Sequence, residues 1–427
     1  MSLDRRDFLK VAGAQAGLAA LGARPATATA APVPARMVQG RSPDVVVIGA
    51  GIFGAFTAYH LRQMGAAVTL VDAYGPGNSR STSGDETRGV RSSYGNVPTP
   101  DLWISWARKA MTAWQAFDAE WGRKLGQPLY YRTGDLIFRE KSELFTERTL
   151  EWWKKLNVPH ETPAVADVQK QYPAFDLKDI GVVLYEPDAG VVRARRACQV
   201  VADAVERTGG KLVIGHASIG PQAGRTLDQV QLAAPFNIVR GAIYVFALGP
   251  WFPKFFPALM GSRIKTPTGH VHYFGTPPAD DRFNFPNLPS WNFPGVTGWP
   301  NLTPDSRGFR VRIGGDRLLD PDYSSRSFER KLDKSAKKLL KQRFPLLKDA
   351  PLIETRSCHY EFSASRNFII DRHPDFDNVW VAGGGSAEGF KFGPVIGEYV
   401  AKRVLGDEGD PEIAEGFSLK MSEPVPD

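Results

Sequence analysis

Cysteine and histidine are scarce in this chain, which has two cysteines and seven histidines among 427 residues. Two cysteines allow at most one disulfide, so a fold held together by several disulfides is excluded. The histidines do not follow the spacing of metal ligands, and His270 and His272 alternate as neighbours on a strand do. We therefore expect no metal site.

The chain also lacks a long apolar segment. Residues 11–23 form a short, weakly apolar run that is rich in Ala and Gly. Such a run is too short and too weakly apolar to cross a bilayer. Arg5 and Arg6 precede it, and small residues at 26–30 provide a cleavage site, a pattern typical of twin-arginine export. We expect residues 1–30 to be a signal peptide, and the mature protein to be periplasmic or secreted without a membrane span.

Charge of one sign does not dominate, because the formal net charge is only +7. The basic residues are scattered rather than clustered with aromatics, which excludes the usual nucleic-acid-binding classes. A mild positive excess favours small anionic substrates. A mature chain of about 395 residues exceeds one ordinary core, so two domains are expected.

The most informative motif present is G-x-G-x-x-G at residues 49–54, which follows the apolar run 45–48 and precedes a helical pattern. Gly49 permits a tight turn, Gly51 lets backbone N–H groups approach a pyrophosphate, and Gly54 lets helix and strand pack closely. The motif predicts a dinucleotide cofactor.

Two neighbouring features strengthen this prediction. Ile52 and Phe53 open the helix, whose positive N-terminal end would face the phosphates. A second apolar run, residues 67–71, ends in Asp72, which is placed to bind a ribose hydroxyl.

The remaining patterns predict an α/β protein (α+β overall). Helices are expected over residues 101–125, 140–156, 193–207, 324–344 and 393–405. Strands are expected within 129–138, 211–215, 241–251, 309–313 and 378–382. The aromatic, proline-rich stretch 283–300 reads as a loop region.

Rossmann-like segments lie near both ends and in the middle of the chain. We expect one discontinuous cofactor domain from residues 43–92, 186–255 and 352–407. A mixed-sheet substrate domain is expected from residues 93–185 and 256–351, with 408–427 as a C-terminal tail. A small ligand usually binds between two such domains.

Four separated motifs make the chain resemble the monomeric sarcosine oxidase type of flavin amine oxidases, within the D-amino-acid oxidase-like superfamily. The resemblance extends from Asp44 to Leu405, and the glycine motif above is its first element. It implies that the cofactor is FAD, that the protein is an FAD-dependent oxidoreductase acting on amines or amino acids, and that it is a monomer.

The second motif lies at residues 83–95 and resembles the family segment S-H-G-x-T-R-x-x-R-x-x-Y. By this resemblance Thr87 and Arg88 lie at the flavin, and Arg91 pairs with the substrate carboxylate. A guanidinium suits that role because its planar fork binds a carboxylate through two hydrogen bonds. Gly84 stands where the family has histidine.

The third motif is Ser357-Cys358-His359-Tyr360. In sarcosine oxidase-like proteins a cysteine at this position forms a thioether with the flavin, and a tyrosine two residues later lines the substrate pocket. Cys358 and Tyr360 match both, so covalent attachment of FAD is expected. Cys198 reads as a thiol packed inside a helix.

The fourth motif, residues 383–394, is a glycine loop after a strand, and its Gly385, Gly389 and Phe390 are expected to approach the flavin. Lys391 matches the family lysine that shares the substrate carboxylate with the second arginine. Glu388 stands where sarcosine oxidase has a histidine, which leaves the substrate's identity open.

The largest departure is Arg310, which takes the place of a family lysine that promotes reaction with oxygen. Gly314 replaces a family histidine on the same segment. A cation at the flavin still stabilises negative charge there, but a guanidinium has a different geometry from an ammonium. We assign Arg310 a catalytic role beside Arg91, Lys391 and Tyr360.

The resemblance implies oxidation of the C–N bond of an N-methylamino acid or amino acid to an imine that hydrolyses, with oxygen reduced to hydrogen peroxide. Arg310 keeps a second hypothesis open, a dehydrogenase that passes electrons to another acceptor. A third is a catalytically silent flavin-binding protein. Sarcosine is the family's usual substrate, whereas the aromatic stretch 283–299 would suit a bulkier side chain.

Overall fold

The computed structural model describes residues 44–126, 128–233, 238–303, 307–315, 317–326 and 330–425. These residues lie in one compact unit. The expected signal peptide, residues 1–30, lies outside them. The division into a cofactor domain and a substrate domain stays a prediction.

A six-stranded sheet carries the glycine motif and has the order β22-β23-β14-β1-β2-β8. Its strands are β1 Asp44–Ile48, β2 Ala67–Asp72, β8 Lys211–Ile214, β14 Ile243–Phe246, β22 Ile369–Arg372 and β23 Val379–Gly383. All neighbours are parallel except β22 and β23. Four segments far apart in sequence thus form one mostly parallel sheet, which confirms the predicted fold class.

Helices α2, α3, α6 and α10 form a hydrophobic core with this sheet. Their bounds are α2 Ile52–Gln63, α3 Pro100–Phe117, α6 Ala194–Arg207 and α10 Gly393–Val404. Helix α6 buries Ala197, Val201 and Val205, which recur every four residues and therefore lie on one face. Helix α10 approaches α2 so closely that a Cβ on Gly397 would lie 2.4 Å from the Cβ of Phe56. The backbones of α10 and α2 therefore pack directly against each other.

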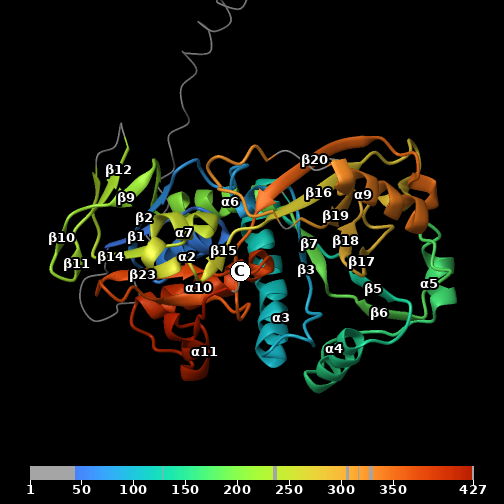
Figure 1. Cartoon of the computed structure of the whole chain (residues 1–427), viewed down its shortest axis with the longest axis horizontal. Helices are drawn as coiled ribbons and strands as arrows, with labels where there is room; N and C mark the ends of the chain where they lie inside the picture. The colour runs from blue at the N-terminus through green and yellow to red at the C-terminus, as the bar shows by residue number, and fades with distance from the viewer. Residues whose placement is uncertain are drawn as a thin grey trace, which may run out of the picture. The chain divides into compact units, whose positions relative to one another are not determined.

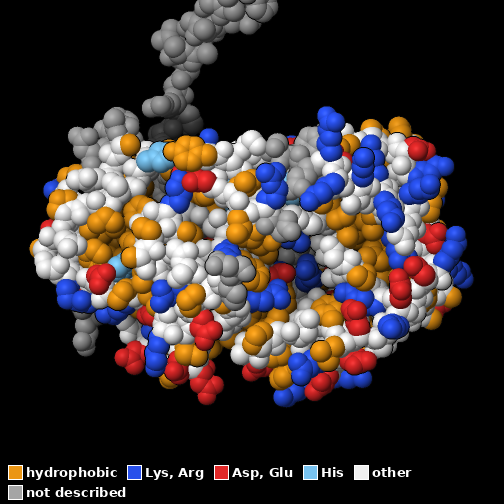
Figure 2. Space-filling view, viewed as in Figure 1, with side chains coloured by type: hydrophobic (Ala, Val, Ile, Leu, Met, Phe, Trp, Pro, Cys, Tyr) orange, Lys and Arg blue, Asp and Glu red, His pale blue; other side chains and the backbone are white. Residues whose placement is uncertain are grey.

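A seven-stranded mixed sheet has the order β20-β16-β19-β18-β17-β5-β6. Its strands are β5 Asp135–Arg139, β6 Val182–Glu186, β16 Thr268–Phe274, β17 Ser290–Phe293, β18 Val296–Trp299, β19 Phe309–Ile313 and β20 Leu352–His359. A second core fills the space between this sheet and helices α5 Val165–Gln171 and α9 Arg330–Arg343. Helix α3 lies between the two sheets in Figure 1, and basic side chains gather over α9 in Figure 2.

The prediction that residues 283–300 form a loop region is wrong in part, because they include two strands. Strands β17 and β18 pair antiparallel around the turn Pro294-Gly295, where Gly295 has φ 72°. The prolines and glycines mark this turn rather than a structureless segment. The aromatic residues Trp291 and Phe293 fill the second core instead of a ligand pocket.

Helix α9 is also shorter than predicted, since it begins at Arg330 and not at Ser324. Arg326 has φ 53°, which a continuous right-handed helix does not allow. The remaining strands are β3 Arg88–Val90, β4 Tyr130–Tyr131, β7 Gly190–Val192, β9 Ala217–Ile219, β10 Gln222–Ala223, β11 Thr226–Leu227, β12 Val230–Leu232, β13 Ile238–Val239, β15 Ile264–Lys265 and β21 Phe362–Ser363. The remaining α-helices are α4 Leu144–Lys155, α7 Phe252–Phe255, α8 Pro257–Met260 and α11 Pro411–Gly416. No helix in the described part of the chain has the length and apolarity needed to span a membrane.

Candidate active site

A cavity of about 430 Å³ lies at the carboxyl ends of β1, β2 and β14. We call it the larger cavity. Its size is in the range of cofactor sites, about 300–1,000 Å³. Ligands of parallel α/β sheets bind at this edge, where the strand order changes direction.

The glycine motif has the geometry that a dinucleotide requires. Gly49 has φ 105°, and a Cβ there would lie 2.2 Å from the carbonyl oxygen of Ala247. A Cβ on Gly54 would lie 1.8 Å from the carbonyl oxygen of Gly49. Helix α2 has no acidic residue in its first turn and no side-chain cap on Gly51, so its positive end faces the cavity.

Asp72 lines the larger cavity and holds the turns around it. Its carboxylate accepts hydrogen bonds from the backbone amides of Ala50 at 2.7 Å and of Tyr74 and Gly75 at 2.8 Å each. Burial raises the pKa of Asp72, although these amide hydrogen bonds oppose the shift. The acid therefore positions the glycine loop, and its oxygens lie where the ribose of a dinucleotide is expected.

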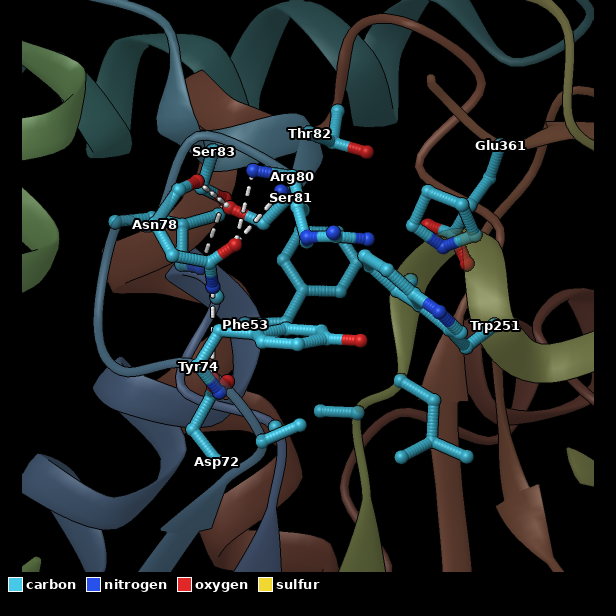
Figure 3. A pocket seen from close by; sticks show the side chains of 18 of the residues that line it. Phe53, Asp72, Tyr74, Asn78, Arg80, Ser81, Thr82, Ser83, Trp251 and Glu361 are labelled. Atoms are coloured by element: carbon cyan, nitrogen blue, oxygen red, sulfur yellow. Dashed lines mark hydrogen bonds between the residues drawn. The ribbon is translucent and has the colours of Figure 1, made fainter. Parts of the chain in front are cut away.

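The segment after β2 forms one wall of the larger cavity, as Figure 3 shows. The side chain of Asn78 accepts hydrogen bonds from the amides of Arg80 and Ser81, at 3.0 and 3.1 Å. The Arg80 guanidinium lies 5.0 Å from the centre of the Tyr74 ring. Trp251 and Glu361 lie on the opposite side (Figure 3). Arg80 thus adds a positive charge to a cavity suited to a pyrophosphate.

Glu361 is a buried acid at the glycine loop that follows β23. It accepts hydrogen bonds from the amides of Gly384 at 3.2 Å and Gly385 at 3.1 Å. Burial raises the pKa of Glu361. Gly385, which was expected to approach the flavin, therefore donates its amide hydrogen bond to a carboxylate that was not predicted.

A second cavity of about 70 Å³ adjoins the first. We call it the smaller cavity. Arg88, Tyr360 and Phe390 line both cavities. The smaller cavity is also lined by Arg91, Gly269, Thr297, Trp299, Arg310, Arg312, Cys358, Glu388 and Lys391. It is therefore a small space with many cations beside the larger one.

Cys358 lies near the junction of the two cavities. It belongs to β20, opposite Gly269 of β16, and its thiol is a free, partly exposed group. The Arg88 guanidinium lies 3.7 Å from the Cys358 sulfur. The thiol thus lies beside a cation that lines both cavities.

Arg310 and Arg88 share one buried acid, Asp85. The Asp85 carboxylate pairs with Arg88 and lies 3.1 Å from a terminal nitrogen of Arg310. The Arg310 guanidinium stacks 3.8 Å from the centre of the Trp299 ring. Burial favours the neutral acid, yet the two arginines lower the pKa of Asp85 well below its usual range. The cation predicted at residue 310 is present, and its charge is partly balanced.

The Glu388 carboxylate forms ion pairs with Lys391 and Arg91, the two cations predicted to bind a substrate carboxylate. Its carboxylate pairs with Lys391, accepts a hydrogen bond from the Tyr94 hydroxyl at 2.7 Å, and lies 3.9 Å from Arg91. Burial opposes its charge, but Lys391 and Arg91 lower the pKa of Glu388 well below its usual range. Arg91 and Tyr94, which follow β3, thus meet Lys391 of the last glycine loop around the Glu388 carboxylate.

The structure places the sequence-predicted residues as follows. Those lining the larger cavity are Gly49, Gly51, Ile52, Phe53, Asp72, Arg88, Tyr360, Gly385, Gly389 and Phe390. Those lining the smaller cavity are Arg88, Arg91, Arg310, Cys358, Tyr360, Phe390 and Lys391.

Two predicted residues line neither cavity. Thr87 instead accepts a hydrogen bond from the indole N–H of Trp299 at 2.9 Å, and Gly54 packs against Gly49. Sequence reasoning missed Asp85 and Glu361, although each is an acid within or next to a recognised motif. The position of these acids, inside the second motif and directly after the third, is the feature of the sequence that could have identified them.

The other candidate groups have structural surroundings. Cys198 is fully buried in α6, and burial raises the pKa of its thiol to about 12. His272 pairs with Asp333 of α9 at 2.8 Å. Within the described ranges, no group of three or more His, Cys, Asp or Glu side chains is arranged to hold a metal ion.

Comparison with known proteins identifies related chains. A family model described as FAD dependent oxidoreductase matches residues 44–403. Monomeric sarcosine oxidase of Arthrobacter sp. (strain TE1826) is 24% identical over 377 residues, which cover 87% of this chain and 94% of that protein. N-methyl-L-tryptophan oxidase of Yersinia pestis is 25% identical over 392 residues, covering 88% of this chain and 98% of the relative.

Solved structures share the fold at lower identity. Iminodiacetate oxidase from Chelativorans sp. BNC1 has a TM-score of 0.71 at 21% identity, over 89% of this chain and 99% of that one. L-proline dehydrogenase from P. horikoshii has a TM-score of 0.75 at 18% identity, over 89% and 98%.

Proposed function

The chain belongs to the family of FAD-dependent oxidoreductases, and from this premise we propose that it oxidises the C–N bond of an N-methylamino acid or amino acid. The observation that carries the proposal is the position of Arg91 and Lys391, which line a small cavity that shares Arg88 and Tyr360 with the larger one. The names of the relatives, a sarcosine oxidase and an N-methyl-L-tryptophan oxidase, support an amino-acid substrate.

The proposed reaction breaks a C–H bond next to the amine nitrogen. Two electrons and the hydrogen leave as a hydride equivalent, the nitrogen lone pair forms the C=N bond, and water hydrolyses the imine. Bound FAD supplies the electron acceptor for this step. Oxygen then takes up two electrons and two protons, which yields hydrogen peroxide.

The chain's own residues bind and orient the substrate in this proposal. Arg91 offers a planar fork to the substrate carboxylate, and Lys391 adds a second positive charge beside it. Tyr360 shapes the amine side of the smaller cavity, at its boundary with the larger one. Holding the reacting carbon at this boundary supplies orientation, which contributes a large share of catalysis in such sites.

A dehydrogenase that uses another acceptor is the second candidate. Arg310 favours the dehydrogenase, because its guanidinium is paired with Asp85 and differs in shape from a compact ammonium group. A guanidinium that is already paired stabilises reduced oxygen species less than an unpaired cation would.

The test is to add a panel of N-methyl and primary amino acids to the purified protein without oxygen, follow the visible flavin absorbance, and then admit air. Bleaching that recovers rapidly in air supports the oxidase, and bleaching that recovers slowly supports the dehydrogenase. No bleaching by any member of the panel would overturn the proposal.

We also propose that FAD is attached covalently through Cys358. The support is that the sulfur lies beside Arg88, which lines both cavities, so the thiol is within reach of a cofactor that extends from one cavity to the other. In the Cys358→Ser variant, acid denaturation should release all the flavin, whereas the unchanged protein should keep it through denaturation. Mass spectrometry of the denatured chains measures this, and Cys198→Ser is the matched control because Cys198 is buried in α6. Flavin released from the unchanged protein would contradict the attachment.

We propose that residues 1–30 direct twin-arginine export. We also propose that the exported protein is a monomer. The support is the pair Arg5-Arg6 ahead of the short apolar run. Replacing both arginines by lysine should keep the protein in the cytoplasm, which cell fractionation measures, and continued export would contradict the proposal.

Lys391 gives the proposed site a pH dependence. Burial lowers its pKa to about 8, with Arg91 and Arg312 acting in the same direction and Glu388 opposing them. As pH rises through about 8 the ammonium loses its proton, so a substrate carboxylate should bind more weakly above that pH. The half-saturating substrate concentration for flavin bleaching between pH 7 and pH 9.5, flanking that value, measures the change.

The matched variant for this prediction is Lys391→Arg, whose guanidinium stays charged over the whole range. It should show a flat profile. A break at the same pH in both proteins would assign the titration to another group.

A further inference from the structure

The smaller cavity contains more positive charge than one substrate carboxylate requires. Five cations line it, and Glu388 is the acid among the described lining residues. The five are Arg88, Arg91, Arg310, Arg312 and Lys391. Isolated charges are costly to bury, so each cation needs a partner.

Internal acids account for three of these cations. Asp85 pairs with Arg88 and Arg310 behind the cavity wall. Glu388 pairs closely with Lys391, whereas its distance to Arg91 is 3.9 Å, too long for a hydrogen bond. Two guanidinium groups therefore remain without an acid at hydrogen-bond distance.

Arg91 and Arg312 are those two groups. Across the described ranges, neither guanidinium donates a hydrogen bond to another residue; Arg91 lies 3.9 Å from Glu388, and Arg312 has no ion pair. Each offers a planar set of N–H donors that matches a carboxylate. Both side chains line the same cavity, so their donors are available to a ligand there.

Strand β19 explains why Arg312 faces this cavity. Successive side chains of a strand point to opposite faces, so Arg310 and Arg312 share one face while Val311 packs into the second core. Arg312 lies opposite Thr297 of β18 and Val271 of β16. A Cβ on Gly269 would lie 3.9 Å from an Arg312 terminal nitrogen, so the guanidinium lies beside Gly269 of β16, which lines the same cavity.

We propose that the substrate carries two acidic groups, one bound by Arg91 and the other by Arg312. This inference rests on the proposed function, since it names the substrate class of the same site. The volume of about 70 Å³ favours a compact molecule, because a single water needs about 10–15 Å³ on this measure. A small secondary amine with a carboxylate on each arm fits both the charge and the size, and a bulky aromatic substrate does not.

The test measures binding with two unreactive sulfur analogues that differ in one acidic group, thiodiacetate and (methylthio)acetate. FAD-loaded full-length protein is titrated with each by calorimetry. The dicarboxylate should bind at least about 10-fold more tightly, the low end for a hydrogen bond to a charged group. In Arg312→Gln this preference should fall to about 2-fold or less, while (methylthio)acetate affinity stays within about 2-fold.

Two further variants make the result specific. Arg312→Lys should retain part of the preference, because it keeps the charge without the fork. Arg282→Gln, which alters an exposed arginine paired with Asp280, should leave both affinities unchanged. Equal affinities in the unchanged protein, no binding of either analogue, or the same loss for both analogues in Arg312→Gln would overturn the inference.

Failure of this inference and failure of the proposed function are distinguishable. If sarcosine bleaches the flavin but thiodiacetate shows no preference, the second acidic group is wrong and amine oxidation stands. If thiodiacetate is preferred but no amine bleaches the flavin, the site binds dicarboxylates and the proposed oxidation is wrong.

Discussion

Replacing Asp85 by asparagine is expected to lower the free energy of unfolding by about 3–5 kcal/mol. The Asp85 carboxylate is fully buried and is the acid that pairs with both Arg88 and Arg310. Asparagine keeps the shape but not the charge, so two guanidinium groups would lose their counter-ion in a buried place. Denaturant unfolding at constant FAD concentration measures the loss.

The matched control for this prediction is Asp377→Asn. Asp377 pairs with Arg225 at 2.9 Å, but both side chains are more than half exposed. Water screens such a pair, so the control should change stability by less than about 1 kcal/mol. Equal effects of the two substitutions would show that Asp85 carries no special electrostatic role.

The same substitution should also weaken the flavin site. Arg88 lines both cavities and lies next to Cys358, so a change in its position reaches the thiol and the cofactor. Arg310 would lose the partner that holds it over the Trp299 ring. We therefore expect a smaller share of FAD retained after denaturation in Asp85→Asn than in Asp377→Asn.

The parts of the site that could be predicted are those fixed by local sequence. The turn at Gly49 and the helix start at Ile52 follow from a continuous motif, because a strand, a tight turn and a helix leave few alternatives. Strand β19 was predicted with its observed bounds, since its alternating residues mark one buried face.

The partners of the charged residues could not be predicted in this way. The pairing of Asp85 with Arg310 depends on β19 lying against the segment before β3, which are distant in sequence. Glu388 looked like a change of substrate preference, but the fold places it on Lys391, three residues later in a tight helical turn. Arg312 belongs to none of the four motifs, and only the cavity shows that its side chain lines a space for a ligand.

Replacing Arg91 by methionine is expected to raise the half-saturating substrate concentration by about 30- to 5,000-fold, the effect of about 2–5 kcal/mol. Arg91 lines the smaller cavity and makes no hydrogen bond within the described part of the chain, since its nearest acid, Glu388, lies 3.9 Å away, so its N–H groups can bind a carboxylate. Methionine fills similar space but cannot bind the acid. Anaerobic bleaching of the flavin at increasing substrate concentration measures the shift, and the bound FAD absorbance shows that the cofactor is retained.

The decisive comparison for Arg91→Met is a substrate pair that differs only in the acid, sarcosine and dimethylamine. The loss should fall on sarcosine, because dimethylamine has no carboxylate for Arg91 to bind. Lys402→Met, which removes an exposed cation paired with Glu398 at 2.6 Å, should leave both substrates unaffected. An equal loss for both amines in Arg91→Met would mean that Arg91 shapes the cavity and does not bind the acid. The substrate carboxylate would then have to lie against Lys391, where Glu388 already provides a negative charge.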